Sequence, residues 1–116
     1  MYKNLVIWKD SVYLIKEIYK LVDMLPKSED YNLKSQLKRA VVSVALNIAE
    51  GKCRATSKEF SHFLNTASAS LYEVTAILEI CEELEYLSEL GKFYNKINLL
   101  NRRINSLRNK LMEESD

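Results

Sequence analysis

The sequence predicts an all-α protein, an antiparallel up-and-down four-helix bundle that assembles as a homo-oligomer. Among the 116 residues there are two Gly and one Pro, and these two residue types are the main interruptions of regular structure. Apolar residues recur at spacings of three and four through four long segments, which is the period of a helix with one buried face. An excess of apolar residues on the second segment predicts the oligomer. The length predicts one domain, residues 1–116.

The first predicted helix covers about residues 5–24, and Pro26 follows it. Because proline cannot continue a helix, the chain is expected to turn there. One apolar stripe has the three-and-four spacing, and further apolar residues widen it. The stripe is Leu5, Trp8, Val12, Ile15, Tyr19 and Val22, and the residues that widen it are Leu14, Ile18 and Leu21.

The second predicted helix, about residues 31–50, is apolar almost all round in its second half. Its main stripe is Leu33, Leu37, Val41, Val44 and Ile48, and the apolar residues off that stripe are Val42, Ala45, Leu46 and Ala49. A helix with this pattern is buried on more than one side. A single bundle of this length has too little protein to cover every face, so we expect these four residues to lie in a subunit interface. Ser43 and Asn47 lie on the same apolar half and are expected to be hydrogen-bonded structural groups.

The third and fourth predicted helices cover about residues 57–85 and 89–112. Thr56 and Glu59 form the spacing of a capping box, in which the threonine accepts a hydrogen bond from the first turn and the glutamate reaches back. The chain is expected to turn near Leu87 and Ser88 before the fourth helix. The third stripe is Phe60, Leu64, Ala67, Leu71, Val74, Leu78 and Cys81, and the fourth is Leu90, Phe93, Ile97, Leu100, Ile104, Leu107 and Leu111.

The stretch "NIAEGKCRATSKEF", residues 47–60, joins the second helix to the third. It faintly resembles a phosphate-binding P-loop, but Leu46 stands where that motif has its first Gly, and Cys53 stands where it has Ser or Thr. It also follows a helix and not a strand. We therefore interpret the stretch as a helix–helix joint, in which Gly51 ends one helix and Thr56 caps the next.

The net charge of +1 conceals two basic segments and one acidic segment. Lysine and arginine dominate residues 34–58 and 92–112, whereas residues 79–89 are rich in glutamate. The basic face of the fourth helix is expected to be solvated or paired with the acidic face of the third. At the joint, two alternatives remain open: ion pairs that fix the corner, or contacts to RNA phosphates. The candidate contacts are Lys52, Arg54 and Lys58, followed by Lys38 and Arg39.

No residue pattern predicts catalysis, a metal site, a cofactor or a small-molecule substrate, so we expect no enzyme. His62 is the single histidine and lacks a paired ligand spacing, and Glu59-x-x-His62 occurs once where a carboxylate-bridged metal site needs two copies. Cys53 and Cys81 are expected to be reduced, buried thiols. The most apolar stretch, "AVVSVALNIA", has ten residues and is too short to span a bilayer. With no signal-peptide pattern at the N-terminus, we expect a cytoplasmic protein.

The stretch "LKRAVVSVALNIAEGKCRATSKEFSHFLNTASASLYEV", preceded by "VIWKDSVYLIKEIY" and "YNLKSQL", resembles the four-helix-bundle proteins encoded in intervening sequences of bacterial 23S rRNA genes. The similarity covers about residues 5–88, and its most specific part is "NIAEG..R.(S/T).KEF..FL". Ala45 stands where the family often has Pro, and Ala69 where it usually has Gly. The resemblance implies a homopentamer. It also implies kinship to accessory proteins of diversity-generating retroelements, which are strongly basic pentamers that bind nucleic acid and a reverse transcriptase.

These observations lead to two hypotheses. The first is a non-catalytic, homo-oligomeric scaffold, a pentamer by resemblance, that binds RNA or an RNA-handling protein. The alternative is a protein-interaction or structural module with no nucleic-acid role. The salt dependence of RNA binding distinguishes them, because phosphate contacts weaken steeply as salt rises.

Overall fold

The computed structural model describes residues 1–115. It contains four α-helices and two short 3-10 helices, and no strand occurs in the described residues. The α-helices are α1 (Val6–Val22), α2 (Leu33–Lys52), α3 (Ser57–Glu83) and α4 (Gly91–Ser115), and the 3-10 helices are η1 (Tyr2–Asn4) and η2 (Lys27–Glu29). The all-α prediction is confirmed, and the predicted helix ends differ from these bounds by a few residues.

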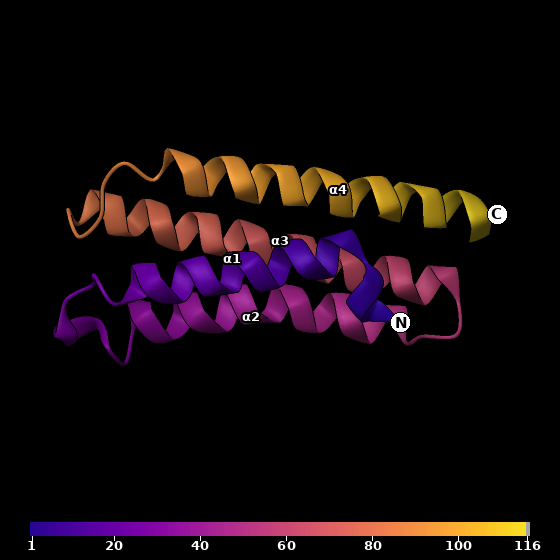
Figure 1. Cartoon of the computed structure of the whole chain (residues 1–116), viewed down its shortest axis with the longest axis horizontal. Helices are drawn as coiled ribbons and strands as arrows, with labels where there is room; N and C mark the ends of the chain where they lie inside the picture. The colour runs from indigo at the N-terminus through magenta and orange to yellow at the C-terminus, as the bar shows by residue number, and fades with distance from the viewer. Residues whose placement is uncertain (116) are drawn as a thin grey trace.

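The four helices lie lengthwise beside one another, with the connections at the two ends of the molecule (Figure 1). The molecule measures 48 × 23 × 20 Å. α2 packs most extensively against α3, and α3 also packs against α4. α1 packs against α2 and, over a shorter stretch, against α4. The α1–α4 seam is therefore the least closed side of the structure.

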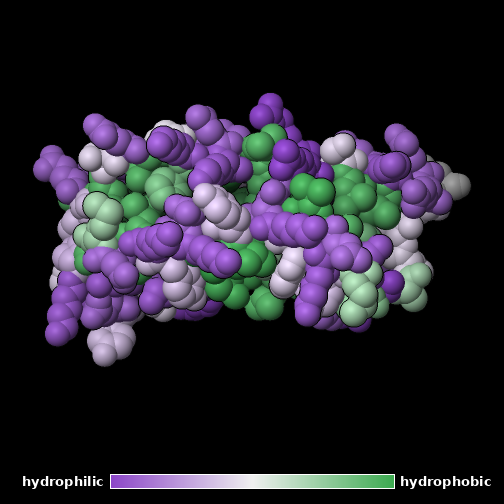
Figure 2. All heavy atoms as spheres, viewed as in Figure 1, coloured by the Kyte–Doolittle hydropathy of each residue, from purple (hydrophilic) through white to green (hydrophobic). Residues whose placement is uncertain are grey.

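The core combines the stripes predicted for the last three helices with buried residues of α1. All of the stripe residues of α2 and α3 are buried, and those of α4 are buried or packed against the core. Around this core the surface is mixed, and apolar atoms show between charged side chains along the face seen in Figure 2. The three-and-four spacing therefore placed the buried faces of these three helices correctly.

The predicted buried face of α1 is confirmed in part, because its centre lies about a quarter turn away from the centre of the predicted stripe. Val22 is buried, and Leu5, Trp8 and Ile15 are partly buried and pack against the core, whereas Tyr19 is 41% exposed. The buried residues of α1 are Ile7, Ser11, Leu14, Ile18, Leu21 and Val22. Two apolar stripes overlap on this helix. The residues expected merely to widen the stripe are the ones that face α2 and α4.

Thr56 caps α3 as predicted. Its hydroxyl oxygen accepts a hydrogen bond from the backbone N–H of Glu59 at 3.1 Å. The hydroxyl in turn donates to the Glu59 carboxylate at 3.1 Å. The glutamate of this capping box therefore reaches the threonine hydroxyl, and the corner between α2 and α3 is held by side chains from both ends of the motif.

Gly51 does not end α2, contrary to the prediction. The helix continues through Lys52, and no glycine in the described residues has a positive φ. Gly51 is buried, and a Cβ at this position would lie 2.8 Å from Cδ1 of Phe60 and 2.8 Å from Cβ of Phe63. The residue is needed because α3 passes too close to α2 for any side chain.

A Schellman motif ends α3. The backbone N–H of Tyr86 donates to the carbonyl of Cys81 at 2.9 Å, and that of Glu85 donates to the carbonyl of Glu82 at 2.9 Å. Such a motif needs a left-handed residue after the cap, usually glycine. Here Glu85 takes that conformation, with φ of 61°.

Candidate nucleic-acid and assembly surfaces

The joint between α2 and α3 is a short helix–helix connection at one end of the molecule (Figure 1). Because α2 precedes it, the geometry of a P-loop, in which a strand leads into the phosphate loop, is absent from this part of the chain. The interpretation as a joint is confirmed.

The three cations at the joint differ in how they are held. Arg54 pairs with Glu50 one turn earlier and lies over the ring of Phe63, 4.9 Å from its centroid. The Lys52 ammonium lies 5.8 Å from the ring centroid of Phe60. Lys58 is exposed on the first turn of α3. Within residues 1–115, neither lysine forms an ion pair.

Lys38 and Arg39 lie well away from the joint. Fourteen residues of helix separate Lys38 from Lys52, which is about 20 Å at 1.5 Å per residue. The Lys38 ammonium lies 5.1 Å from the ring centroid of Tyr19 on α1, and Arg39 donates to the hydroxyl of Ser35 at 3.2 Å. The structure therefore does not gather the five predicted contact residues into one site.

The four residues predicted to lie in a subunit interface divide into three groups. Leu46 is 61% exposed, although it lies between the buried residues Ala45 and Ile48 in the second half of α2. Val42 and Ala49 are half-buried. Ala45 is 3% exposed and is already covered within its own chain, so it offers almost no surface to a partner.

The polar residues on the apolar half of α2 form a network with α3. The side-chain amide of Asn47 donates to the carbonyl oxygen of Ser43 at 2.8 Å and to its hydroxyl at 3.0 Å. The Ser43 and Ser70 hydroxyls are 3.0 Å apart, and Ser70 donates to the carbonyl of Thr66. These bonds satisfy half-buried polar groups and fix the register of the two helices.

The histidine and the cysteines do not converge. Within residues 1–115, no group of three or more metal-ligating side chains is close enough to hold an ion. His62 is exposed, and Glu59 is engaged with Thr56. Cys81 is buried, as predicted, but Cys53 is exposed at the end of α2, so that part of the prediction is wrong.

The basic face of α4 pairs with α1 and not with the acidic face of α3. Arg103 donates to Asp10 at 2.6 Å, and the Lys96 ammonium lies 4.6 Å from the ring centroid of Tyr13. On α3, Glu82 instead accepts a hydrogen bond from the Tyr94 hydroxyl. The α3–α4 ion pairs, one of the two expectations, do not occur within residues 1–115. The other expectation holds for most of this face, because Lys92, Arg102 and Lys110 are exposed.

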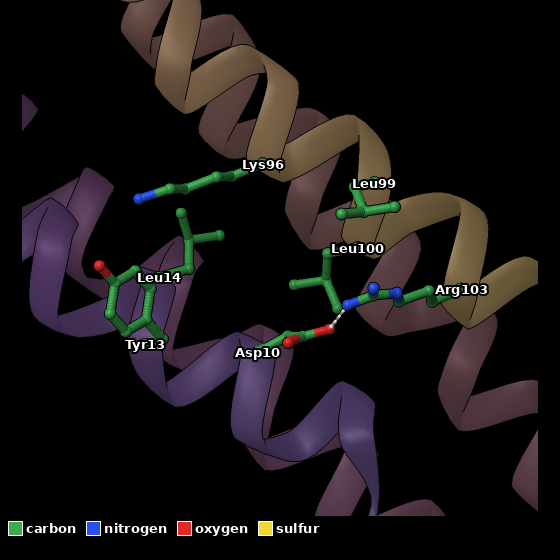
Figure 3. Close-up of a pocket in the computed structure, with 7 residues that line it drawn as sticks. All are labelled: Asp10, Tyr13, Leu14, Lys96, Leu99, Leu100 and Arg103. Atoms are coloured by element: carbon green, nitrogen blue, oxygen red, sulfur yellow. Dashed lines mark hydrogen bonds and ion pairs between the residues drawn. The ribbon is translucent and has the colours of Figure 1, made fainter.

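Sequence reasoning missed a groove at this seam. It is lined by Asp10, Tyr13, Leu14, Lys96, Leu99, Leu100 and Arg103 (Figure 3). Tyr13 lies outside the apolar stripe predicted for its helix, and no motif links residues 10–14 to residues 96–103.

The helices and their buried stripes define an all-α, four-helix protein. Residues 3–106 match the family described as 23S rRNA-intervening sequence protein, and the chain belongs to that family.

A solved structure has the same fold. It is the crystal structure of a protein with unknown function from the S23 ribosomal protein family of Bacteroides thetaiotaomicron, with a TM-score of 0.73 and 24% sequence identity. The match covers 97% of this chain and 99% of that one. No curated protein was found to match the chain. No helix within residues 1–115 is long and apolar enough to cross a membrane.

Proposed function

We propose that the chain forms an antiparallel up-and-down four-helix bundle that assembles as a homopentamer. The assembly acts as a non-catalytic scaffold that binds RNA or an RNA-handling protein. The observation that carries the proposal is Leu46, which is 61% exposed in the middle of α2 beside half-buried Val42 and Ala49. An exposed apolar strip on a long helix is typical of an interaction surface.

The outer face of α3 supplies a complementary strip. Tyr72 is 65% exposed and Ile80 is 47% exposed, with exposed Ala69 and Ala76 at helical spacing between and beside them. This strip is flanked by exposed carboxylates on α3, whereas exposed Arg39 flanks the strip on α2. Docking α2 of one copy on α3 of the next is a head-to-tail contact, which forms a closed ring when the rotation between successive copies closes and an open filament when it does not. A pentamer requires the closing rotation.

The joint would repeat around one rim of such a ring. Each copy presents exposed Lys52, Arg54 and Lys58 at the same end of its long axis. Weak phosphate contacts from several copies add through avidity. The ribosomal family name of the similar crystal structure supports an association with RNA.

Assembly is tested by solution mass and by the variant Leu46→Asp. We expect wild-type protein to behave as an oligomer and the variant to dissociate, because a carboxylate in an apolar interface is costly to desolvate. The matched control is Met24→Asp, since Met24 is 70% exposed at the end of α1 and outside both strips. Dissociation by both variants, or by neither, would contradict the proposed interface.

RNA binding is tested by replacing Lys52, Arg54 and Lys58 together with glutamate. We expect loss of RNA retention with unchanged assembly, and a steep fall in wild-type affinity as salt rises. Retention by the triple variant would show that the joint does not bind RNA. One observation favours the alternative, a protein-interaction module. Arg54 is already paired with Glu50 and stacked on Phe63, so it is partly satisfied without RNA.

A further inference from the structure

The groove between α1 and α4 has an apolar floor and a volume of about 200 Å³. Leu14 and Leu100 form its floor and are 2% and 3% exposed. Tyr13 and Leu99 line its sides and are 54% and 41% exposed. Figure 3 shows these side chains facing one another across the seam between the two helices. An apolar cavity of about 150 Å³ holds a benzene molecule, so the groove has room for a flat ring.

Polar groups close the two ends of the groove. At one end the Lys96 ammonium lies over the Tyr13 ring, and within residues 1–115 it has no carboxylate partner. At the other end Arg103 donates to Asp10 at 2.6 Å (Figure 3). A guanidinium has five N–H donors and a carboxylate has two acceptor oxygens. The Asp10–Arg103 pair therefore keeps both donors and acceptors for a ligand.

A row of lysines continues from the groove along the outside of α1. Lys9, Lys16 and Lys20 are exposed at helical spacings that place them on the same side as Tyr13. Half-buried Glu17 and exposed Asp23 are the acidic groups beside this row that are not ion-paired within residues 1–115, and they are outnumbered by the three lysines together with Lys96. The face that surrounds the groove is therefore positive and is suited to a chain of phosphates.

We propose that the α1–α4 groove holds one base of a single-stranded RNA. The ring stacks against Tyr13 above the floor of Leu14 and Leu100, its polar edge meets the Asp10–Arg103 pair, and the neighbouring phosphates contact Lys96 and the α1 lysines. Asp10 favours a base over an aromatic carboxylate, because a base edge offers N–H donors and a carboxylate offers only acceptors. The inference rests on the proposed RNA binding but places it on a different surface from the joint.

The groove also determines the kind of RNA. A base can enter only when it is unstacked and unpaired, whereas a duplex keeps its bases inside. Proteins that bind single strands combine a positive surface with aromatic side chains, and each stacked base contributes severalfold or more to affinity. We therefore expect a single-stranded, adenine-rich RNA to bind more tightly than the same sequence in a duplex.

The experiment measures affinity by fluorescence anisotropy with a labelled, unstructured adenine-rich RNA. We expect Tyr13→Ala to weaken binding about tenfold. Tyr31→Ala is the matched control, since Tyr31 is exposed on the connection before α2, outside the groove and outside both apolar strips. Lys96→Glu should weaken RNA binding more than Lys27→Glu, which makes the same charge change on the α1–α2 connection. A further probe is a nucleic-acid strand with the same sugar–phosphate backbone but without bases. Wild-type protein should bind this strand no more tightly than Tyr13→Ala binds the RNA.

The outcomes separate this inference from the proposed function. If wild-type protein binds neither the single-stranded RNA nor the duplex, both the groove inference and the proposed RNA binding fail. If wild-type protein binds RNA but Tyr13→Ala binds it as tightly as Tyr31→Ala, the groove inference fails and the joint remains the RNA surface. The same conclusion follows if the duplex binds as tightly as the single strand. Equal losses of RNA affinity in Lys96→Glu and Lys27→Glu would mean that the protein attracts RNA only through its general charge. That result would also overturn the inference.

Discussion

Gly51→Ala should destabilise the protein, although alanine is the better helix former. In a helix interior the change from glycine to alanine normally stabilises by about 1 kcal/mol. Here the new Cβ would lie 2.8 Å from Cβ of Phe63 and 2.8 Å from Cδ1 of Phe60. Carbon atoms pack best at about 3.5–4.0 Å. The Phe60 ring can rotate away, but Cβ of Phe63 moves only with the backbone of α3.

The size of the effect follows from these two opposing contributions. Forcing a methyl group into a close-packed contact costs about 1–3 kcal/mol, so the net loss in the free energy of unfolding is about 1 kcal/mol after the gain in helix propensity. The assay is urea denaturation followed by far-UV circular dichroism, at one protein concentration because assembly would shift the apparent stability.

Gly91→Ala is the matched control. Gly91 is the first residue of α4, and a Cβ there would meet no other atom within 4 Å. This variant should be as stable as wild-type protein or more stable. Equal stabilisation by Gly51→Ala and Gly91→Ala would refute the close approach of α2 and α3 at the joint.

Three further predictions follow from local structure. Glu85→Gly should stabilise the protein by about 0.5 kcal/mol in the same urea assay. A non-glycine residue at φ 61° costs more free energy than the entropy that glycine adds to the unfolded chain. A loss of stability would contradict this prediction. Burial and the hydrogen bond to Glu82 raise the pKa of Tyr94. The folded state therefore holds this proton more tightly, and the resulting stability is lost as pH rises above about 10. Unfolding measured against pH should show a smaller loss in Tyr94→Phe, and identical curves would contradict the prediction. Cys53 is exposed and should react with a thiol reagent in the folded protein. Cys81 is 0% exposed and burial raises its pKa, so it should react only on unfolding. Rapid reaction of both thiols in the folded protein would contradict this prediction.

The core faces of three helices could be predicted from the sequence because each carries one regular stripe of large apolar residues, although α2 also has apolar residues off its stripe, of which Ala45 is buried and Leu46 is exposed. In α4, for example, the heptad residues Ile97, Leu100 and Ile104 are all buried. On α1, by contrast, Trp8 and Tyr19 belong to one stripe and Leu14 to another, and both stripes have helical spacing. Only the packing of α1 against α2 and α4 decides between them, and periodicity within one segment does not contain that information.

The same limit applies to the candidate sites. The sequence identified the cations of the joint, but it gave no sign that Arg54 pairs with Glu50 or that Lys38 lies far from Lys52. Gly51 was expected to end a helix because glycine often does, whereas its actual role depends on the approach of α3. The α1–α4 groove could not be predicted at all, because its two walls are more than 80 residues apart in the chain.

The most direct test of the account is the mass of the protein in solution, measured by light scattering on a sizing column at low and high salt. We expect a mass near five times the 13.5 kDa of one chain. This mass should change little with salt, because the exposed strips of α2 and α3 are apolar. A mass of 13.5 kDa at both salt concentrations would contradict it. Leu46 would then be a surface leucine without a partner, and the scaffold would lose its physical basis.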